Sequence, residues 1–360
     1  MSDPLALDEM SLAKDPMLAG LLASAPPRIP AEHAEAVLRE HWGIDGQTHE
    51  IACERDQNFR VETTQGIGYV LKLSNPQENP QNTNFQTEAL RWVERTDPTL
   101  PVPRVVATRE GHQELTLKLP DGRYSVVRVL SWIDGTPLYM VGITPAMQEK
   151  IGTILARLGR ALCGFKHPGA RHAILWDIRN TTRLRPLTDA LEKDGVGAMV
   201  REELEHFESE VAPRLSRLRR QIVHNDLNHH NIIVDPDDVG KIAGILDFGD
   251  LVDTHLAIDV AVAASYLAND DEPLTAVCRM VRAYHALTPL EREEILLLRD
   301  LIVARLVTSI TITNWRAARY PDNAEYILRN NGPARSAMLS FAALPRNQVN
   351  QALLHACEME

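Results

Sequence analysis

The chain has 360 residues, and a hydrophobic content of 44% is enough for substantial cores in two domains or lobes. Its formal net charge of −11 argues against a nucleic-acid partner, for which a basic face is expected. The four cysteines lie far apart with no C-x-x-C pair, which predicts a reducing, cytoplasmic location. The apolar patch Leu18–Ala25 is too short for a membrane span, so we expect no membrane partner.

The first third of the chain predicts a small antiparallel sheet with two helices. After an N-terminal extension, residues 1–30, apolar residues at helical spacing predict a helix over Ala31–His41. A second helix is predicted over Thr83–Thr96. Alternating patterns predict strands around these helices at His49–Cys53, Asn58–Thr63, Tyr69–Leu73, Arg104–Thr108 and Tyr124–Leu130.

The rest of the chain, beyond the link Ser131–Gly135, is mostly helical in pattern. We expect helices at Met147–Gly164, Val200–Leu218, Ala257–Leu267, Leu274–Ala286, Pro289–Ala317 and Asn323–Leu344. This order predicts an α+β fold with two lobes, residues 31–130 and 131–360. The functional site is expected in the cleft between the lobes.

The most informative segment is Ile222–Val234, followed a short turn later by Gly244–Gly249. Two apolar, strand-like runs in it frame three polar residues, Asp226, Asn231 and Asp247. A carboxylate in D-L-x-x-x-N suits acceptance of a hydroxyl proton, and the amide oxygen and the D-F-G carboxylate are hard ligands for Mg²⁺. The segment therefore predicts phosphoryl transfer from a nucleoside triphosphate, with Asp226 as the base and Asn231 and Asp247 as metal ligands.

Two other interpretations of this segment were weighed. Asp-Phe-Gly by itself is also an ordinary exit from a strand into a turn. Asp226 with the nearby histidines also resembles a metal-ligand cluster, although the spacing matches no common zinc pattern and leaves D-F-G unexplained. The histidines concerned are His224, His229 and His230.

The upstream lobe contains residues suited to holding a nucleotide. Lys72 lies in the third predicted strand and Glu88 in the following helix, so a Lys–Glu pair would direct the ammonium at the phosphates. The alternative is a surface lysine and a solvated glutamate. The turn that should cover the phosphates, Cys53–Asn58, has no glycine, so its polar side chains Arg55, Gln57 or Asn58 are expected to compensate there.

The link between the lobes is the candidate site for the base of the nucleotide. An apolar strand runs into Trp132 and Ile133, whose backbone groups can bond a purine edge while their side chains shape a slot. The pattern leaves open whether Trp132 points at the base or into the core.

These motifs resemble the aminoglycoside phosphotransferase and choline kinase superfamily, which shares the protein-kinase fold, and within it the hydroxylysine kinases. The resemblance is carried by D-Q-N-F, Y-V-L-K-L-S-N, H-N-D-L-N-H-H-N and G-I-L-D-F-G-D, spread over about 200 residues in the family's order. It implies an alcohol-accepting kinase with the roles given above for the catalytic and metal residues, with Lys72 and Glu88 anchoring the phosphates. It also implies that Asp259 braces the catalytic loop. The resemblance further implies ATP or GTP as the donor with Mg²⁺, and an acceptor such as 5-hydroxylysine.

The acceptor is expected to be a small molecule. No A-P-E segment follows D-F-G, and the connection from D-F-G to the helix predicted at Ala257 is too short to form a platform that binds a peptide. The acceptor can be cationic. The candidate residues that would contact it are Asp250, Asp253, Trp176, Trp315 and Arg316. Each has an ordinary structural alternative, such as a helix cap or a core tryptophan. Two other functions remain open, an antibiotic phosphotransferase and a nucleotide-binding pseudokinase, and the sequence does not fix the oligomeric state.

Overall fold

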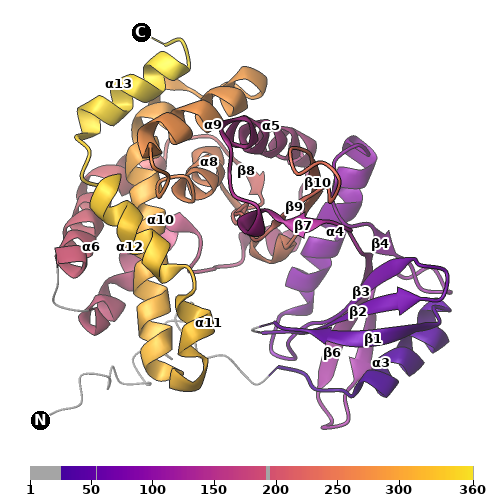
Figure 1. Cartoon of the computed structure of the whole chain (residues 1–360). Coiled ribbons are helices and arrows are strands. Elements are labelled where there is room, and N and C mark those ends of the chain that lie inside the picture. Colours follow the sequence, from indigo (N-terminus) through magenta and orange to yellow (C-terminus); the bar gives the residue numbers. More distant parts are fainter. Residues whose placement is uncertain (1–25, 54, 192–194, 360) are drawn as a thin grey trace, which may run out of the picture.

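The computed structural model describes residues 26–53, 55–191 and 195–359. The apolar patch Leu18–Ala25 and most of the expected extension 1–30 lie outside the described residues. The chain forms a small sheet with helices at one end and a larger helical part at the other (Figure 1). The predicted α+β class with two lobes is confirmed. Within the described residues, no helix combines the length and apolar character needed to cross a bilayer.

The sheet of the first lobe is antiparallel, with strand order β1-β2-β3-β6-β4 and β5 added beside β6. The predicted strands are present with small shifts at their ends, and β5 was not predicted. The strands are β1 (Gly46–Ile51), β2 (Gln57–Thr63), β3 (Gly68–Leu73), β4 (Val105–Val106), β5 (Leu115–Lys118) and β6 (Tyr124–Ser131).

The two faces of this sheet have different environments. Phe59, Leu71 and Val129 lie on one face and pack with α3 (Ala31–Val37), which continues as the π-helical turn Leu38–Trp42. The opposite face turns to α4 (Pro80–Thr96) and to the second lobe. Since strand side chains alternate between faces, every second residue of β2, β3 and β6 points to α4 or the cleft.

The second lobe is mainly helical. Its α-helices are α5 (Pro145–Leu162), α6 (Gly195–His206), α7 (Ala212–Leu215), α8 (Leu256–Ser265), α9 (Pro273–Leu287), α10 (Arg292–Arg319), α11 (Ala324–Leu328), α12 (Asn331–Ser340) and α13 (Arg346–Ala356). Shorter 3₁₀ or π segments are Leu138–Met140, Pro168–Arg171, Ile178–Ala190, Phe207–Val211, Phe248–Asp250 and Pro321–Asn323. The single helix predicted over Asn323–Leu344 is instead α11 and α12, and α13 was not predicted.

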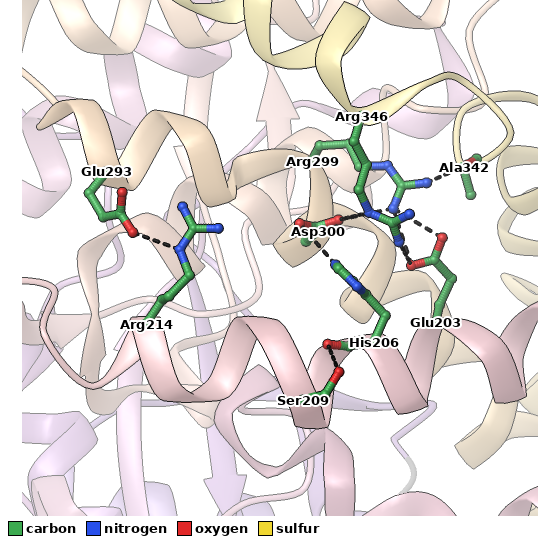
Figure 2. Close-up of polar contacts among 9 residues, drawn as sticks. All are labelled: Glu203, His206, Ser209, Arg214, Glu293, Arg299, Asp300, Ala342 and Arg346. Carbon is green, nitrogen blue, oxygen red and sulfur yellow. Dashed lines mark hydrogen bonds and ion pairs between the residues drawn. The ribbon is translucent and has the colours of Figure 1, made fainter.

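Helix α10 is the central helix of this lobe (Figure 1). Most of its side chains between Glu294 and Thr313 are buried, so it is packed on nearly all sides. Near its start, Arg299 donates to both carboxylate oxygens of Glu203 on α6, at 3.0 and 3.1 Å. Arg346 of α13 bonds both Glu203 and Asp300, and His206 lies 3.4 Å from Asp300 (Figure 2). These contacts fix α10 against α6 and α13.

Two short antiparallel ribbons carry the catalytic segment between α5 and α8. The hairpin β9 (Ile232–Val234) with β10 (Ile242–Ile245) is joined by β7 (Thr136–Pro137), and β8 (Arg220–Val223) pairs with β11 (Val252–His255). The segment between β8 and β9 and the turn after β10 therefore emerge beside each other.

Candidate active site

The loop between β8 and β9 is held by contacts beneath it. The amide of Asn225 donates to the carboxylate of Asp259 at 2.7 Å, the bracing role that the resemblance implied. His224 bonds the carbonyl of Leu246 at 3.0 Å through Nε2 and accepts from the amide of Asp226 through Nδ1. Asn225 has φ 65°, a left-handed conformation that asparagine tolerates better than most residues. The loop is therefore anchored to both α8 and the strand before D-F-G.

The carboxylate of Asp226 accepts three hydrogen bonds. Oδ2 accepts from the side-chain amides of Asn228 at 3.0 Å and Asn231 at 2.9 Å, and Oδ1 accepts from Arg305 at 2.8 Å. An ionised carboxylate has about four lone-pair sites. One site thus remains for a further donor such as a substrate hydroxyl.

Arg305 of α10 was not predicted as a site residue. Its side chain is 3% exposed, and it also donates to the hydroxyl of Tyr266 and lies over the ring of Trp176 at 4.9 Å. Burial raises the pKa of the Asp226 carboxyl, and the charge of Arg305 opposes that rise by favouring the ionised form. The signal in the sequence was an arginine in the apolar helical run Leu301–Leu306, where a buried charge requires a partner.

Asn231 and Asp247 fit a magnesium site. Both hydrogen bonds from the Asn231 amide nitrogen go to Asp226, so its amide oxygen is left available as a ligand. Asp247 has φ 58° and an exposed side chain, of which Oδ1 accepts only from the amide of Gly249, at 3.2 Å. Among the described residues no three His, Cys, Asp or Glu side chains form a metal cage. Two oxygen ligands, completed by waters and substrate phosphates, are typical of Mg²⁺.

Asp250 is within electrostatic reach of the carboxylates of Asp226 and Asp247. Burial raises the pKa of Asp250 to about 7, and the negative charges of Asp226 and Asp247 add to the rise. The mutual repulsion of these carboxyl groups favours a cationic group near Asp250, such as a substrate ammonium.

A polar row crosses the sheet above these groups. In the antiparallel register Asn58 of β2 is opposite Lys72 of β3, which is opposite Arg128 of β6. Directly opposed residues point to the same face, here the face toward α4 and the cleft. Among the described residues Lys72 makes no hydrogen bond or ion pair, and the Asn58 side-chain oxygen is buried without a donor. The Lys72 ammonium is therefore available to a ligand.

The predicted Lys72–Glu88 pair is not formed in the structure. Glu88 accepts from Arg91, one helical turn further along α4, at 2.7 Å. Its charge acts on the pKa of His167, whose ring contacts Asn84 on the same side of the helix. Glu88 therefore faces away from the row of Asn58, Lys72 and Arg128. The rotation of α4 about its own axis differs from the one that a Lys72–Glu88 pair requires.

The glycine-free turn is held by Asn75. Its amide donates to Asp56 at 3.0 Å, and its side chain donates to the carbonyl of Arg55 at 2.9 Å. The Arg55 side chain pairs with Glu78 at 3.2 Å, and its charge reaches Asp250. Arg55 thus lies at the edge of the cleft, with more than half of its side chain exposed.

The link between the lobes places its two candidate residues differently. The Trp132 ring lies 4.5 Å from the guanidinium of Arg60, and its amide already donates to the carbonyl of Gly68. Ile133 covers Gly244 of β10 so closely that a Cβ there would lie 2.7 Å from its side chain. Ile133 therefore packs against the strand that leads to Asp247.

The remaining acceptor candidates are divided by the structure. Trp176 reaches the site through its contact with Arg305. Asp253 of β11 instead pairs with Arg220 of β8 and with Arg171 of the 3₁₀ segment Pro168–Arg171, so its carboxylate is already engaged. Trp315 is buried in a cluster with Leu175, Leu184, Leu187 and Ile312, and Arg316 is its neighbour on α10. The structure thus assigns Trp315 to the core.

The histidines do not form the alternative metal cluster. His230 bonds Asn330 at 3.1 Å and packs on Tyr139, and burial lowers the pKa of His229 to about 4. His224 is used beneath the loop. The rings of His229 and His230 lie 4.4 Å apart, but no group of three potential metal ligands occurs among the described residues.

A pocket of about 280 Å³ opens beside the catalytic loop. His229 and Tyr266 line it, and the Tyr266 hydroxyl connects it through Arg305 to Asp226. The acidic residue in its lining is Asp270, whose carboxylate accepts from Gln148 at 3.0 Å. The pocket is therefore mostly neutral, although it lies next to the acidic group around Asp226.

The two-lobed fold and the arrangement of Asp226, Asn231 and Asp247 define a phosphotransferase that acts on an alcohol group. Residues 51–296 match the model of the phosphotransferase enzyme family, and the chain belongs to that family. It is a small-molecule kinase.

Curated relatives span most of the chain. Hydroxylysine kinase of Mus musculus is 27% identical over 330 residues, which cover 85% of this chain and 87% of the relative. Homoserine kinase of Methylobacillus flagellatus is 28% identical over 250 residues, 66% of this chain and 69% of the relative. Among solved structures, an amicoumacin kinase has a TM-score of 0.67 at 12% identity and covers 89% of this chain and 97% of its own. That likeness concerns the fold alone.

Proposed function

We propose that this kinase transfers the γ-phosphoryl group of ATP or GTP to the hydroxyl of an amino acid or amino alcohol such as 5-hydroxylysine. The lobe of residues 31–130 binds the nucleotide, and residues 131–360 hold the catalytic loop and the acceptor. Relatives named for amino-acid acceptors, hydroxylysine and homoserine, cover most of the chain and support this acceptor class.

The observation that carries the proposal is the lone-pair site left on Asp226. Two amides and a guanidinium fix the carboxylate, so the remaining position has a defined direction. An acceptor hydroxyl donates to it, attacks the γ-phosphorus and transfers its proton to the carboxylate as the nucleoside diphosphate leaves. Fixing the base in this way reduces the reorganisation needed during the reaction.

The phosphates are held from both lobes. Lys72, which has no protein partner among the described residues, bonds phosphate oxygens, and Asn58 orients its amide toward them. Asn231 and Asp247 would hold Mg²⁺, which would supply countercharge to the phosphate oxygens.

The acceptor occupies the pocket lined by His229 and Tyr266, with its ammonium group toward Asp250. The lining does not favour a polycationic antibiotic, because its Asp270 is bonded to Gln148 and few other charges are present. The intact set of Lys72, Asp226 and Asp247 argues against a pseudokinase.

The acceptor is tested with Mg²⁺, ATP or GTP and a panel of 5-hydroxylysine, homoserine, an amino alcohol and an aminoglycoside. Nucleoside diphosphate release and the mass of the phosphorylated acceptor are measured together. We expect amino-acid or amino-alcohol phosphorylation to exceed aminoglycoside phosphorylation. The reverse order would make the antibiotic function the correct one.

The base is tested with Asp226→Asn, which is expected to lower kcat about 10²- to 10⁴-fold. The exposed Asp237→Asn, in the β9–β10 hairpin, is the matched control and is expected to leave kcat unchanged. Nucleotide at about 100 times its Kd should stabilise the wild type by roughly 2.7 kcal/mol in Mg²⁺. No shift with either nucleotide would exclude the nucleotide site.

A further inference from the structure

Helix α4 meets the sheet through Arg128 and not through the predicted lysine–glutamate pair. Arg128 is 3% exposed and stands beside Lys72 in the sheet row. Its Nη1 donates to the Thr83 carbonyl and the Thr87 hydroxyl, both at 3.2 Å, and Nη2 donates to the side-chain oxygen of Gln86. These contacts define the face of α4 that looks at the sheet row.

Gln86 extends this contact into the other lobe. With its oxygen bonded to Arg128, its side-chain nitrogen points to the carbonyl of Gly249, at 3.5 Å. Gly249 is the last residue of D-F-G, and its own amide donates to Asp247. The distance is at the long end for a hydrogen bond, so a small change in the separation of the lobes alters this contact.

We infer that Arg128 and Gln86 link the sheet, α4 and the D-F-G turn, and that they act as positioning residues for Asp247 in place of a Lys72–Glu88 pair. The inference rests on the proposed function only where it takes Asp247 as the metal ligand. In this arrangement Lys72 is free to bind phosphate, because α4 is attached to the sheet by Arg128, the neighbour of Lys72 on β6.

The burial of Arg128 separates its role from that of Lys72. Its guanidinium is covered by α4, so it does not contact the nucleotide. The charge of Asp247 nevertheless favours the protonated form and works against the lowering of the Arg128 pKa by burial. The two groups are thus within electrostatic reach, and the neutral amide of Gln86 connects them without neutralising either.

The decisive variant is Gln86→Glu. It keeps an oxygen acceptor for Arg128 but replaces the donor to Gly249 by a second oxygen, so the link breaks at one bond. The matched control is Gln81→Glu, the same change at an exposed position of the same helix. In protein without nucleotide or metal, we expect amide hydrogen exchange in residues 247–251 to be about fivefold faster in Gln86→Glu, from loss of one hydrogen bond, and unchanged in the control.

The second readout is the apparent Mg²⁺ constant for nucleotide binding, measured by thermal shift. Loss of a group that orients a metal ligand typically costs 10- to 100-fold in metal affinity. We expect about a tenfold weaker Mg²⁺ dependence for Gln86→Glu, with nucleotide binding in the absence of Mg²⁺ unchanged. Arg128→Lys, whose single ammonium cannot hold Gln86 and Thr87 together, should show the same shift.

Glu88→Gln decides between the two linkages and is expected to leave the Mg²⁺ constant unchanged. An equal effect of Glu88→Gln and Gln86→Glu would overturn the inference, because Lys72 and Glu88 would then form the working pair. So would Gln86→Glu behaving like Gln81→Glu in both readouts, or Arg128→Lys lowering only the melting temperature. If the wild type phosphorylates no acceptor in the panel, the exchange rates still test the link, so failure of the proposed function is distinguishable.

Discussion

Arg305 and Asp226 form an ion pair of 2.8 Å between the middle of the central helix and the catalytic loop. The arginine is almost completely buried, and the carboxylate side chain is 18% exposed. The pair therefore sits where the shielding by water is weak and the charge of the arginine has a large effect on the carboxylate. It also makes the position of the base depend on the packing of α10.

Replacing Arg305 by Met is expected to shift the acid limb of the pH–rate profile to higher pH. The charge of Arg305 favours the ionised, active form of Asp226, so its removal raises the pKa of the base. An opposite charge at this range typically moves a pKa by 1–3 units, so we expect a shift of about one pH unit or more in kcat/KM. The measurement is kcat/KM between pH 5 and 9.

Arg305→Lys is the control for charge, because it keeps a cation but loses the forked contact with Asp226 and Tyr266. Its acid limb should lie between those of the wild type and Arg305→Met. A lower melting temperature with an unchanged profile in both variants would show that Arg305 acts only in packing.

Asp250 predicts how stability changes with pH in the metal-free protein. Its folded pKa of about 7 lies above the ordinary value of about 3.9, so the folded state binds more protons than the unfolded state between these values. The free energy of unfolding must then fall as pH rises through this window. We expect the melting temperature of the wild type to fall between pH 5 and 7.5, and Asp250→Asn to reduce that fall. Equal pH dependence in both proteins would show that Asp250 titrates normally.

The contacts of Glu203 predict a large stability effect far from the active site. Glu203→Ala leaves Arg299, which is 2% exposed, without its main partner on α6, and we expect a loss of about 3 kcal/mol in the free energy of unfolding. Glu205→Ala on the same helix, where the side chain is 72% exposed, should cost less than about 0.5 kcal/mol. Urea denaturation of both variants measures the difference. Similar midpoints would mean that the α6–α10 contact contributes little.

The sequence was sufficient for the two-lobed fold and for the catalytic segment, because the residues of that segment lie close together in one hairpin region. Asp226 and Asn231 share a loop, and Asp247 follows the adjacent strand, so local spacing already indicated their proximity. Arg305 and Tyr266 come from α10 and the end of α8, and they reach Asp226 only through tertiary packing. No short motif marks them.

The Lys72–Glu88 pair shows a different limit of sequence reasoning. The strand and the helix were both predicted, but a helix turns about 100° per residue, so a small error in phase changes which side chain faces the sheet. Gln86 and Thr87 take that face, and Glu88 does not. Arg128 carried the same signal as Arg305, an arginine within an apolar run, but this signal does not identify the partner. Only the pairing of β3 with β6 showed that Arg128 lies opposite Lys72.

Because Asn58, Lys72 and Arg128 must lie on the same face of the sheet, the number of residues in the β2–β3 turn affects the function of the enzyme. Side chains alternate along a strand, so a slip of β3 by one residue would turn Lys72 toward α3 and bring Leu71 or Leu73 to the cleft. An insertion or deletion of one residue that shifts this pairing would therefore put an ammonium into an apolar core and remove it from the phosphates. The turn between Thr63 and Gly68 is exposed, yet its residue count helps determine whether the enzyme has an active site.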